Sequence, residues 1–170
     1  MLARVHPYDL DLARRADAAA LAAMSRQLVE AGLRPAWDVT RITWHIRDSE
    51  SVVLLARGVA GTAGFAIMRY ADDSAHLNLL AVAPAHRRRG IGRRLVMWLE
   101  ETALTAGTFT IGLELRAGNA AARAFYAALG YREVGSVVGY YQGRESAIRM
   151  ERDVRERREA TPSAAAPPGS

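Results

Sequence analysis

One short segment combines residue types that can bind a phosphate group. Positions 83–95 follow an apolar run and open an amphipathic one, which predicts a strand, a turn and the first turn of a helix. Such a turn directs unpaired backbone N–H groups and the positive end of the helix dipole at one point. Gly90 and Gly92 lack a Cβ and let an anion approach the backbone, and five arginines lie between positions 87 and 94. The predicted ligand is a phosphate or a pyrophosphate.

Two common phosphate motifs do not fit this segment. The P-loop requires a lysine, and the chain contains none. The dinucleotide fingerprint requires a third glycine where this chain has Leu95. The remaining pattern, Arg87-x-x-Gly90-x-Gly92, resembles the acyl-CoA pyrophosphate loop of the GNAT superfamily of N-acetyltransferases.

A second block, at positions 113–131, strengthens this resemblance through Asn119-x6-Tyr126 and Leu129-Gly130-Tyr131. The resemblance covers roughly residues 50–152 and implies the GNAT fold and acetyl-CoA as the acyl donor. No metal is expected, because the four histidines lie far apart without the spacing of metal ligands. The strand before the loop would pair its backbone with the pantetheine amides as a pseudo-strand. The residues implied to bind acetyl-CoA are Leu80, Ala81, Val82, Arg87, Arg88, Arg89, Gly90, Ile91, Gly92, Arg93 and Asn119.

Acetyl transfer to an amine requires a base for the ammonium proton and benefits from a proton donor for the departing thiolate. Glu114 is the candidate base, because it lies on the strand face opposite the leucines of 113–115. Tyr126 is the candidate acid, because a phenol with a pKa near 10 stays neutral at pH 7 yet can donate to a thiolate. It follows Asn119 by two helical turns, so both can face one site. In isolation, a solvated glutamate, a core tyrosine and a helix cap would explain the three residues.

The C-terminal part resembles RimI-type N-terminal (ribosomal) protein acetyltransferases in one further block, positions 140–150. In that subfamily a Tyr-Tyr pair closes over a peptide N-terminus, which makes Tyr140 and Tyr141 candidate acceptor-binding residues. Ser146 departs from the pattern, where an acidic residue is usual. Residues 32–37 are a candidate for the opposite wall of the groove. The histidines lie far apart, and we expect His76 to be structural and His86 to be a solvated loop residue.

Composition limits the remaining possibilities. The 170 residues suit one domain, predicted as 1–154, followed by a disordered Ala/Pro/Ser-rich tail at 155–170. The absence of cysteine excludes disulfides, a thiolate metal site and a cysteine nucleophile, so the acceptor amine would attack the thioester directly. No apolar run approaches the roughly 20 residues of a membrane span, and we expect a cytoplasmic protein, a monomer or a homodimer. The net charge of +5 suits a CoA ligand, and no direct binding to nucleic acid is expected.

Hydrophobic periodicity and turn residues predict an α/β (α+β) fold in which helices pack on a mixed sheet. The resemblance to the GNAT fold implies that this sheet is mostly antiparallel, with about six to seven strands flanked by about four helices. Asp38 and Asn119 are predicted N-caps, and Gly107 and Gly130 are predicted helix ends. The predicted helices are 16–31, 38–47, 90–106 and 119–130, and the predicted strands are 52–57, 62–70, 75–82, 109–116, 131–138 and 146–153.

Three functions stay open. The first is RimI-like acetylation of a protein N-terminus, possibly that of a ribosomal protein. The second is acetylation of a small amine such as an amino acid, a polyamine or a drug. The third is a non-catalytic module that binds acyl-CoA or RNA, against which Glu114 and Tyr126 argue, as does basic charge concentrated at one turn.

Overall fold

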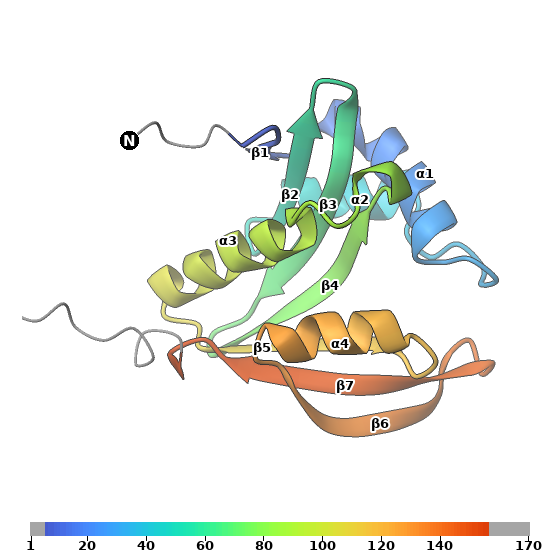
Figure 1. Ribbon diagram of the computed structural model, residues 1–170, viewed down its shortest axis with the longest axis vertical. Helices are drawn as coiled ribbons and strands as arrows, with labels where there is room; N and C mark the ends of the chain where they lie inside the picture. The colour runs from blue at the N-terminus through green and yellow to red at the C-terminus, as the bar shows by residue number, and fades with distance from the viewer. Residues whose placement is uncertain (1–5, 157–170) are drawn as a thin grey trace, which may run out of the picture.

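A single sheet of seven strands organises the computed structural model, which describes residues 6–156 (Figure 1). The strand order is β1-β2-β3-β4-β5-β7-β6, and every neighbouring pair is antiparallel except β4 and β5. The strands are β1 (Asp9–Leu12), β2 (Ser51–Gly58), β3 (Gly61–Tyr70), β4 (Ser74–Val82), β5 (Thr110–Arg116), β6 (Arg132–Tyr141) and β7 (Glu145–Asp153). The α-helices are α1 (Ala18–Leu28), α2 (Val39–Arg47), α3 (Ile91–Ala106) and α4 (Ala120–Ala128). This arrangement confirms the predicted fold class.

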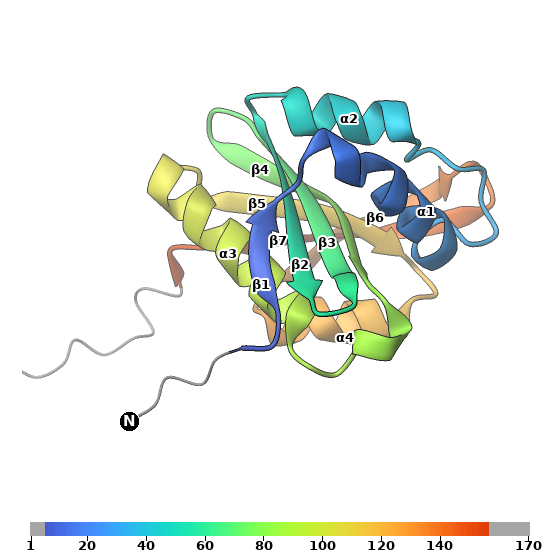
Figure 2. The ribbon, with the colours of Figure 1, turned by 90° about the horizontal axis from the view of Figure 1, so that it is seen from above.

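The helices cover both faces of the sheet (Figures 1 and 2). Helices α1 and α2 pack on one face, where their buried side chains meet Phe65, Ile67 and Leu79. Helices α3 and α4 pack on the other, against residues that include Met68 and Leu113. The central strands β2 and β3 are therefore buried on both faces, which explains why their sequences are continuous apolar runs without alternation.

The sheet divides between β4 and β5. Their parallel pairing covers three positions and ends at His76 opposite Gly112. Beyond that pair β4 continues to Val82 beside β3, and β5 continues to Arg116 beside β7. The carboxyl-terminal halves of β4 and β5 thus lie at neighbouring positions in the sheet order without pairing to each other, and their backbone groups face the opening between them.

The predicted caps are confirmed at three helices. The Asp38 side chain accepts a hydrogen bond from the Arg41 N–H at 2.8 Å, and the Asn119 side chain accepts one from the Ala122 N–H at 3.0 Å. Gly107 ends α3 in the left-handed conformation, with a φ of 82°. Glycine is the residue that adopts this conformation at least cost.

Three predicted elements were wrong in detail. The predicted helix 16–31 is a 3-10 turn at Arg15–Asp17 followed by α1, which ends at Leu28. The predicted helix 119–130 is α4, which is shorter and stops at Ala128, and Gly130 follows in the left-handed conformation (φ 96°) that ends the helix as predicted. Strand β1 was missed, because four mostly exposed residues at a sheet edge carry little hydrophobic signal. Most of the predicted tail lies outside the described residues, and the division into a domain 1–154 and a tail 155–170 stays a prediction.

Candidate functional site

A groove of about 740 Å³ lies where β4, the start of α3 and α4 meet. Of the residues predicted from the resemblance to bind acetyl-CoA, all but Ala81 and Arg89 line it. Ala81 instead lies in the core beneath α1 and α2. Sequence reasoning missed further lining residues, namely His86, Ala121, Ala122, Ala124 and Phe125. The alanines and Phe125 were missed because apolar residues on an amphipathic helix do not reveal which neighbour they face.

The start of α3 presents backbone donors to this groove. Gly90 has a φ of 75°, and the first intrahelical hydrogen bond runs from the Arg94 N–H to the Gly90 carbonyl at 3.0 Å. The N–H groups of Ile91, Gly92 and Arg93 therefore precede the helical hydrogen-bond series at the positive end of the helix dipole. A Cβ at position 92 would lie 3.3 Å from the ring of Phe125. Glycine at this position thus lets α3 approach α4 closely. It also leaves the backbone of α3 exposed to the groove, because no side chain covers it.

The amino-terminal segment holds the loop in place from behind. The Tyr8 side chain is buried, its hydroxyl lies 2.7 Å from His86 Nδ1, and it accepts a hydrogen bond from Arg89 Nη1 at 2.8 Å. Arg94 Nη1 donates to the Tyr8 carbonyl at 2.7 Å. The expectation that His86 is merely solvated was therefore wrong. Tyr8 lies almost eighty positions before these partners, and no local pattern could have indicated the contact.

Glu114 lies on the opposite face of the sheet from the leucines of β5, as predicted, because buried and half-buried residues alternate along this strand. Two side chains from neighbouring strands contact its carboxylate: His76 Nε2 lies 2.8 Å from Oε2, and Arg149 Nε lies 3.3 Å from Oε1. The hydrogen bond from His76 lowers the pKa of Glu114 below its usual value; burial opposes this shift, and the charges of His76 and Arg149 reinforce it. His76 was expected to be structural, and the structure places it on the candidate base.

Tyr126 lies on the face of α4 that packs on the core, and it does not line the groove although Asn119 does. Its ring contacts the rings of Phe125 and Tyr131 edge-on, and burial raises its pKa. Tyr141 links the two candidate catalytic residues: it interacts electrostatically with Tyr126 on one side and with Glu114 on the other. Burial raises the pKa of Tyr141 to about 12.

The loop between α1 and α2 meets the hairpin of β6 and β7, as Figures 1 and 2 both show. The Gln142 side chain accepts a hydrogen bond from the Arg34 N–H at 2.9 Å and donates one to the Arg34 carbonyl at 2.8 Å. The buried Glu30 carboxylate accepts hydrogen bonds from the N–H groups of Ala36 and Trp37, the second at 3.1 Å, which orders the same loop. Residues 32–37, the predicted wall, thus lie against the predicted Tyr-Tyr segment.

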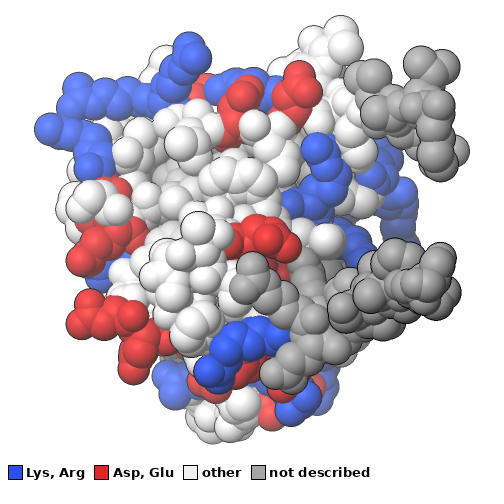
Figure 3. All heavy atoms as spheres, turned by 90° about the vertical axis from the view of Figure 1, so that its left-hand side faces the viewer, with Lys and Arg blue, Asp and Glu red and all other residues white. Residues whose placement is uncertain are grey.

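Within residues 6–156, no group of three or more His, Cys, Asp or Glu side chains is placed to hold a metal ion. In the same part of the chain, no helix has the length and apolarity needed to cross a membrane. The face shown in Figure 3 carries acidic and basic side chains side by side and not one continuous basic surface.

A mixed sheet that divides between two parallel strands, with a backbone phosphate cradle after the first of them, defines the class of acyl-CoA-dependent acetyltransferase folds. The sequence profile of the acetyltransferase (GNAT) family matches residues 19–131, more than half of the chain. The chain belongs to the GNAT family.

Individual relatives agree with this assignment. The chain is 45% identical over 91 residues to the ribosomal protein bS18-alanine N-acetyltransferase of Salmonella typhimurium, an alignment that covers 52% of this chain and 62% of that protein. The structure of the ribosomal-protein-S18-alanine N-acetyltransferase from Escherichia coli superposes with a TM-score of 0.76 at 28% identity, over 94% of this chain and 97% of the other.

The PaiA N-acetyltransferase from Thermoplasma acidophilum, solved in complex with coenzyme A, superposes with a TM-score of 0.75 over 86% of this chain and 98% of the other. Its sequence is 18% identical, so this likeness shows the fold.

Proposed function

We propose that this protein is an acetyl-CoA-dependent N-acetyltransferase that acetylates the N-terminal α-amine of a protein. One observation carries the proposal. The groove with the phosphate cradle lies on the α3–α4 side of the sheet, Glu114 lies on the opposite side, and the opening between β4 and β5 joins the two. The names of the bacterial relatives and the coenzyme A complex of the PaiA structure support this reading.

The geometry suits a direct attack in a ternary complex. The N–H groups at the start of α3, with Arg88 and Arg93 beside them, would hold the pyrophosphate of acetyl-CoA, and the unpaired edge of β4 at Leu80 and Val82 would pair with its pantetheine arm. This places the thioester in the opening, with the acceptor amine arriving from the side of Glu114.

The chemistry then needs three proton transfers. The ammonium group of the acceptor loses one proton to Glu114, directly or through water, and the neutral nitrogen attacks the thioester carbonyl. The C–S bond breaks, and the buried Tyr126 hydroxyl, which burial keeps protonated, donates to the departing thiolate. The nitrogen loses its second proton, which restores the Tyr126 hydroxyl through the solvent, and Glu114 releases its proton to the solvent, so the products are an amide, CoA and one proton. Tyr140 and Tyr141 would hold the backbone of the acceptor next to Glu114.

A ribosomal protein is the proposed acceptor, since the relatives above are named for one. A protein of that kind is made in the cytoplasm, where we also place this enzyme. The oligomeric state is proposed to be a monomer or a homodimer.

Acetyl-CoA-dependent thiol release on a matched panel tests the proposal. The panel contains short peptides with free Ala, Ser, Met and Gly N-termini, the same peptides with blocked N-termini and an internal lysine, and polyamines. We expect turnover on free N-termini alone. Turnover on polyamines or amino acids alone would assign the protein to small-amine acetylation. Binding of RNA without binding of CoA would exclude an acetyltransferase.

A further inference from the structure

His86 is held on one edge of its ring and lines the groove with another. The Tyr8 hydroxyl lies 2.7 Å from His86 Nδ1, and the two rings meet edge-on with their centres 5.5 Å apart. His86 lines the groove, whereas Tyr8 does not. The edge that carries Nδ1 is therefore turned toward the amino-terminal segment. The second ring nitrogen, Nε2, has no hydrogen-bond partner within residues 6–156 and is left for the groove.

Tyr8 is fixed by contacts that do not involve its hydroxyl. Its side chain is 3% exposed, and its ring packs on the end of β2, where a Cβ at position 58 would lie 2.9 Å from the ring. Its backbone is held as well, because Arg94 Nη1 donates to the Tyr8 carbonyl at 2.7 Å. The hydroxyl is thus presented to His86 from a packed position.

Arg89 decides the direction of the hydrogen bond between Tyr8 and His86. A guanidinium can only donate, so the Tyr8 oxygen accepts the hydrogen bond from Arg89 Nη1 at 2.8 Å. The hydroxyl hydrogen is then directed to His86, which is its only other partner within residues 6–156. His86 Nδ1 therefore accepts, and a neutral imidazole that accepts at Nδ1 carries its proton on Nε2.

The groove around His86 suits an anion. Arg88 and Arg93 line it beside the first N–H groups of α3, and no acidic residue in the described part of the chain lines it. Phosphate oxygens are strong acceptors, and a hydrogen bond from a neutral N–H to a charged oxygen is about twice as strong as one between neutral groups. An N–H at His86 Nε2 therefore matches the ligand that the rest of the groove favours.

We infer that His86 is a further phosphate-binding residue, whose Nε2–H donates a hydrogen bond to a phosphate oxygen of acetyl-CoA. Tyr8 and Arg89 are positioning residues that select this tautomer. This inference rests on the proposed function and names a further residue of its donor site. The resemblance implies that Arg89 itself binds acetyl-CoA, but its guanidinium contacts Tyr8 and does not line the groove, so it acts through Tyr8 and His86.

Binding of CoA to the full-length protein tests the donor at Nε2. Calorimetry is performed at about pH 8, where an ordinary imidazole side chain is neutral. The amide of glutamine can place an N–H near the position of Nε2, whereas that of asparagine reaches only the position of Nδ1. We expect His86→Gln to bind CoA within about twofold of the wild type, and His86→Asn and His86→Leu to bind it about tenfold more weakly.

The same titration with 3′-dephospho-CoA identifies the phosphate group. A loss of affinity in His86→Leu that persists with this ligand assigns the hydrogen bond to the pyrophosphate. A loss that disappears assigns it to the 3′-phosphate. Both results support a phosphate-binding role.

A double-mutant cycle tests whether Tyr8 acts through His86. Tyr8→Phe removes the hydroxyl and keeps the ring on β2, and we expect the Kd for CoA to rise about threefold. In the His86→Leu background the same substitution should leave the Kd unchanged, because no imidazole remains to be oriented. Equal losses in both backgrounds would overturn the positioning role of Tyr8.

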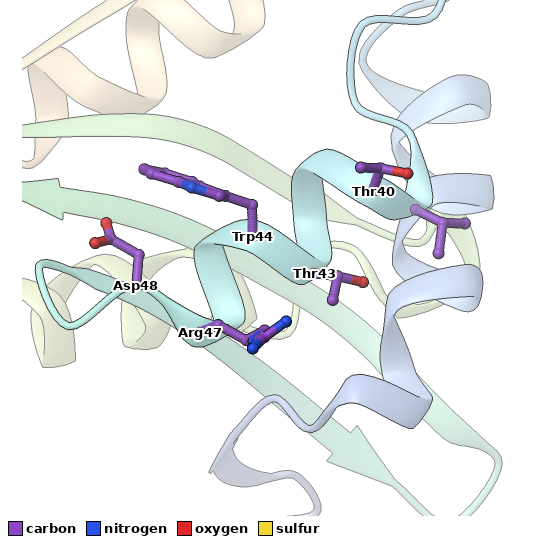
Figure 4. Close-up of a pocket in the computed structure, with 6 residues that line it drawn as sticks. Thr40, Thr43, Trp44, Arg47 and Asp48 are labelled. Carbon is purple, nitrogen blue, oxygen red and sulfur yellow. The ribbon is translucent and has the colours of Figure 1, made fainter.

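Nitrogen NMR of the ligand-free protein reads the tautomer directly, because protonated and unprotonated ring nitrogens give well-separated signals. The His86 signals, identified by their absence in His86→Gln, should show a proton on Nε2 and none on Nδ1. Tyr8→Phe and Arg89→Gln should convert them to those of a tautomer mixture. Arg47→Gln is the matched control for the loss of one exposed arginine, since Arg47 lines a separate hollow on α2 beside Trp44 (Figure 4), and it should keep the wild-type tautomer.

Three results would overturn the inference and leave the proposed function intact. They are a proton on Nδ1 of His86 in the wild type, an unchanged affinity for CoA in His86→Leu, and an equal loss of affinity in all three His86 variants, glutamine included. The last would show that the shape of the imidazole matters and not its donor. No binding of CoA by the wild-type protein would overturn both the inference and the proposed function.

Discussion

At the scale of single residues, the candidate base is held by its neighbours. His76 and Arg149 come from the two strands that flank β5 in the sheet order, and both stabilise the charged form of Glu114. A carboxylate with a lowered pKa is a weak base toward an ammonium ion, yet it stays ionised over the whole range in which the amine titrates. Glu114 would therefore act by orienting the acceptor amine and by receiving one proton from it, and not by its basicity alone.

The pH dependence of the rate follows from this shift. Glu114→Gln should lower kcat about a hundredfold at pH 7 and regain rate as the pH rises past the amine pKa near 8. In the wild type, protonation of Glu114 should not reduce kcat/KM until the pH falls below about 4.5, because its folded-state pKa is lowered. A pH-independent loss in Glu114→Gln would indicate a positioning role.

Substitutions at His76 provide the control. His76→Leu removes the largest cause that lowers the pKa of Glu114 and leaves burial, which raises it, so the acid limb of kcat/KM should move to higher pH. His76→Gln keeps an N–H donor at a similar position, so its kcat/KM should fall at the same acidic pH as that of the wild type. The stability contributed by the lowered pKa is present above about pH 4.5 and is lost as the pH falls through the folded-state value.

A substitution at Tyr126 tests its proposed role as the general acid. Tyr126→Phe removes the hydroxyl and keeps the ring that packs between Phe125 and Tyr131. We expect kcat to fall by about ten- to a hundredfold, with a nearly unchanged KM for acetyl-CoA and a thermal midpoint within a few degrees of the wild type. Single-turnover kinetics and thermal unfolding measure the two effects. An unchanged kcat would leave Tyr126 as a core residue.

At the scale of elements, two loops that are distant in the sequence form one wall. The Gln142 side chain pairs with both backbone groups of Arg34, much as a neighbouring strand would. Glu30 orders the same loop from beneath. The α1–α2 loop and the β6–β7 hairpin should therefore move together when the acceptor binds or leaves.

Breaking the hydrogen bonds between Gln142 and Arg34 should weaken binding of the peptide acceptor and leave binding of acetyl-CoA unchanged. Gln142→Ala removes both hydrogen bonds to Arg34, and we expect the KM for a peptide acceptor to rise severalfold while the KM for acetyl-CoA stays constant. Tyr141→Ala should raise the peptide KM as well. Steady-state kinetics with each substrate varied in turn measures the two KM values separately. A rise in both KM values would point to a general distortion of the site.

At the scale of the whole molecule, a buried ion pair connects the two parts of the divided sheet. Glu100 of α3 and Arg152 of β7 lie 3.0 Å apart with side chains 3% and 8% exposed. Helix α3 packs on β2, β3 and β4, whereas β7 belongs to the part beyond the opening. The pair therefore helps to fix the relative position of the phosphate cradle and the acceptor hairpin.

Removing one partner should be costly. Arg152→Leu or Glu100→Leu alone should reduce the free energy of unfolding by about 3–5 kcal/mol, because each removes the opposite charge that compensates a buried charge, whereas the double substitution should recover much of the loss. Glu133→Ala breaks the exposed pair with Arg123 and should cost much less than either single substitution, because solvent screens this pair. Urea unfolding measures all four variants. Additive losses in the double variant would contradict the argument.

Local features were predictable because their signals are local. The caps at Asp38 and Asn119, the glycine at the end of α3 and the alternation that turns Glu114 away from the leucines each depend on residues a few positions apart. The strand, the glycine turn and the helix start at positions 74–106 were predictable for the same reason, since they are contiguous in the chain. The phosphate ligand of this turn stays a prediction.

Only the tertiary structure decided the contacts between distant segments. The sequence by itself determined the fold class, because periodicity and turn chemistry act over one or two turns of chain; the roles given to the loop at positions 87–93 and to Glu114 stay predictions. It did not determine that His76 and Arg149 hold Glu114 or that Tyr8 holds the loop. Those contacts depend on strand order and register, which many weak long-range interactions settle together.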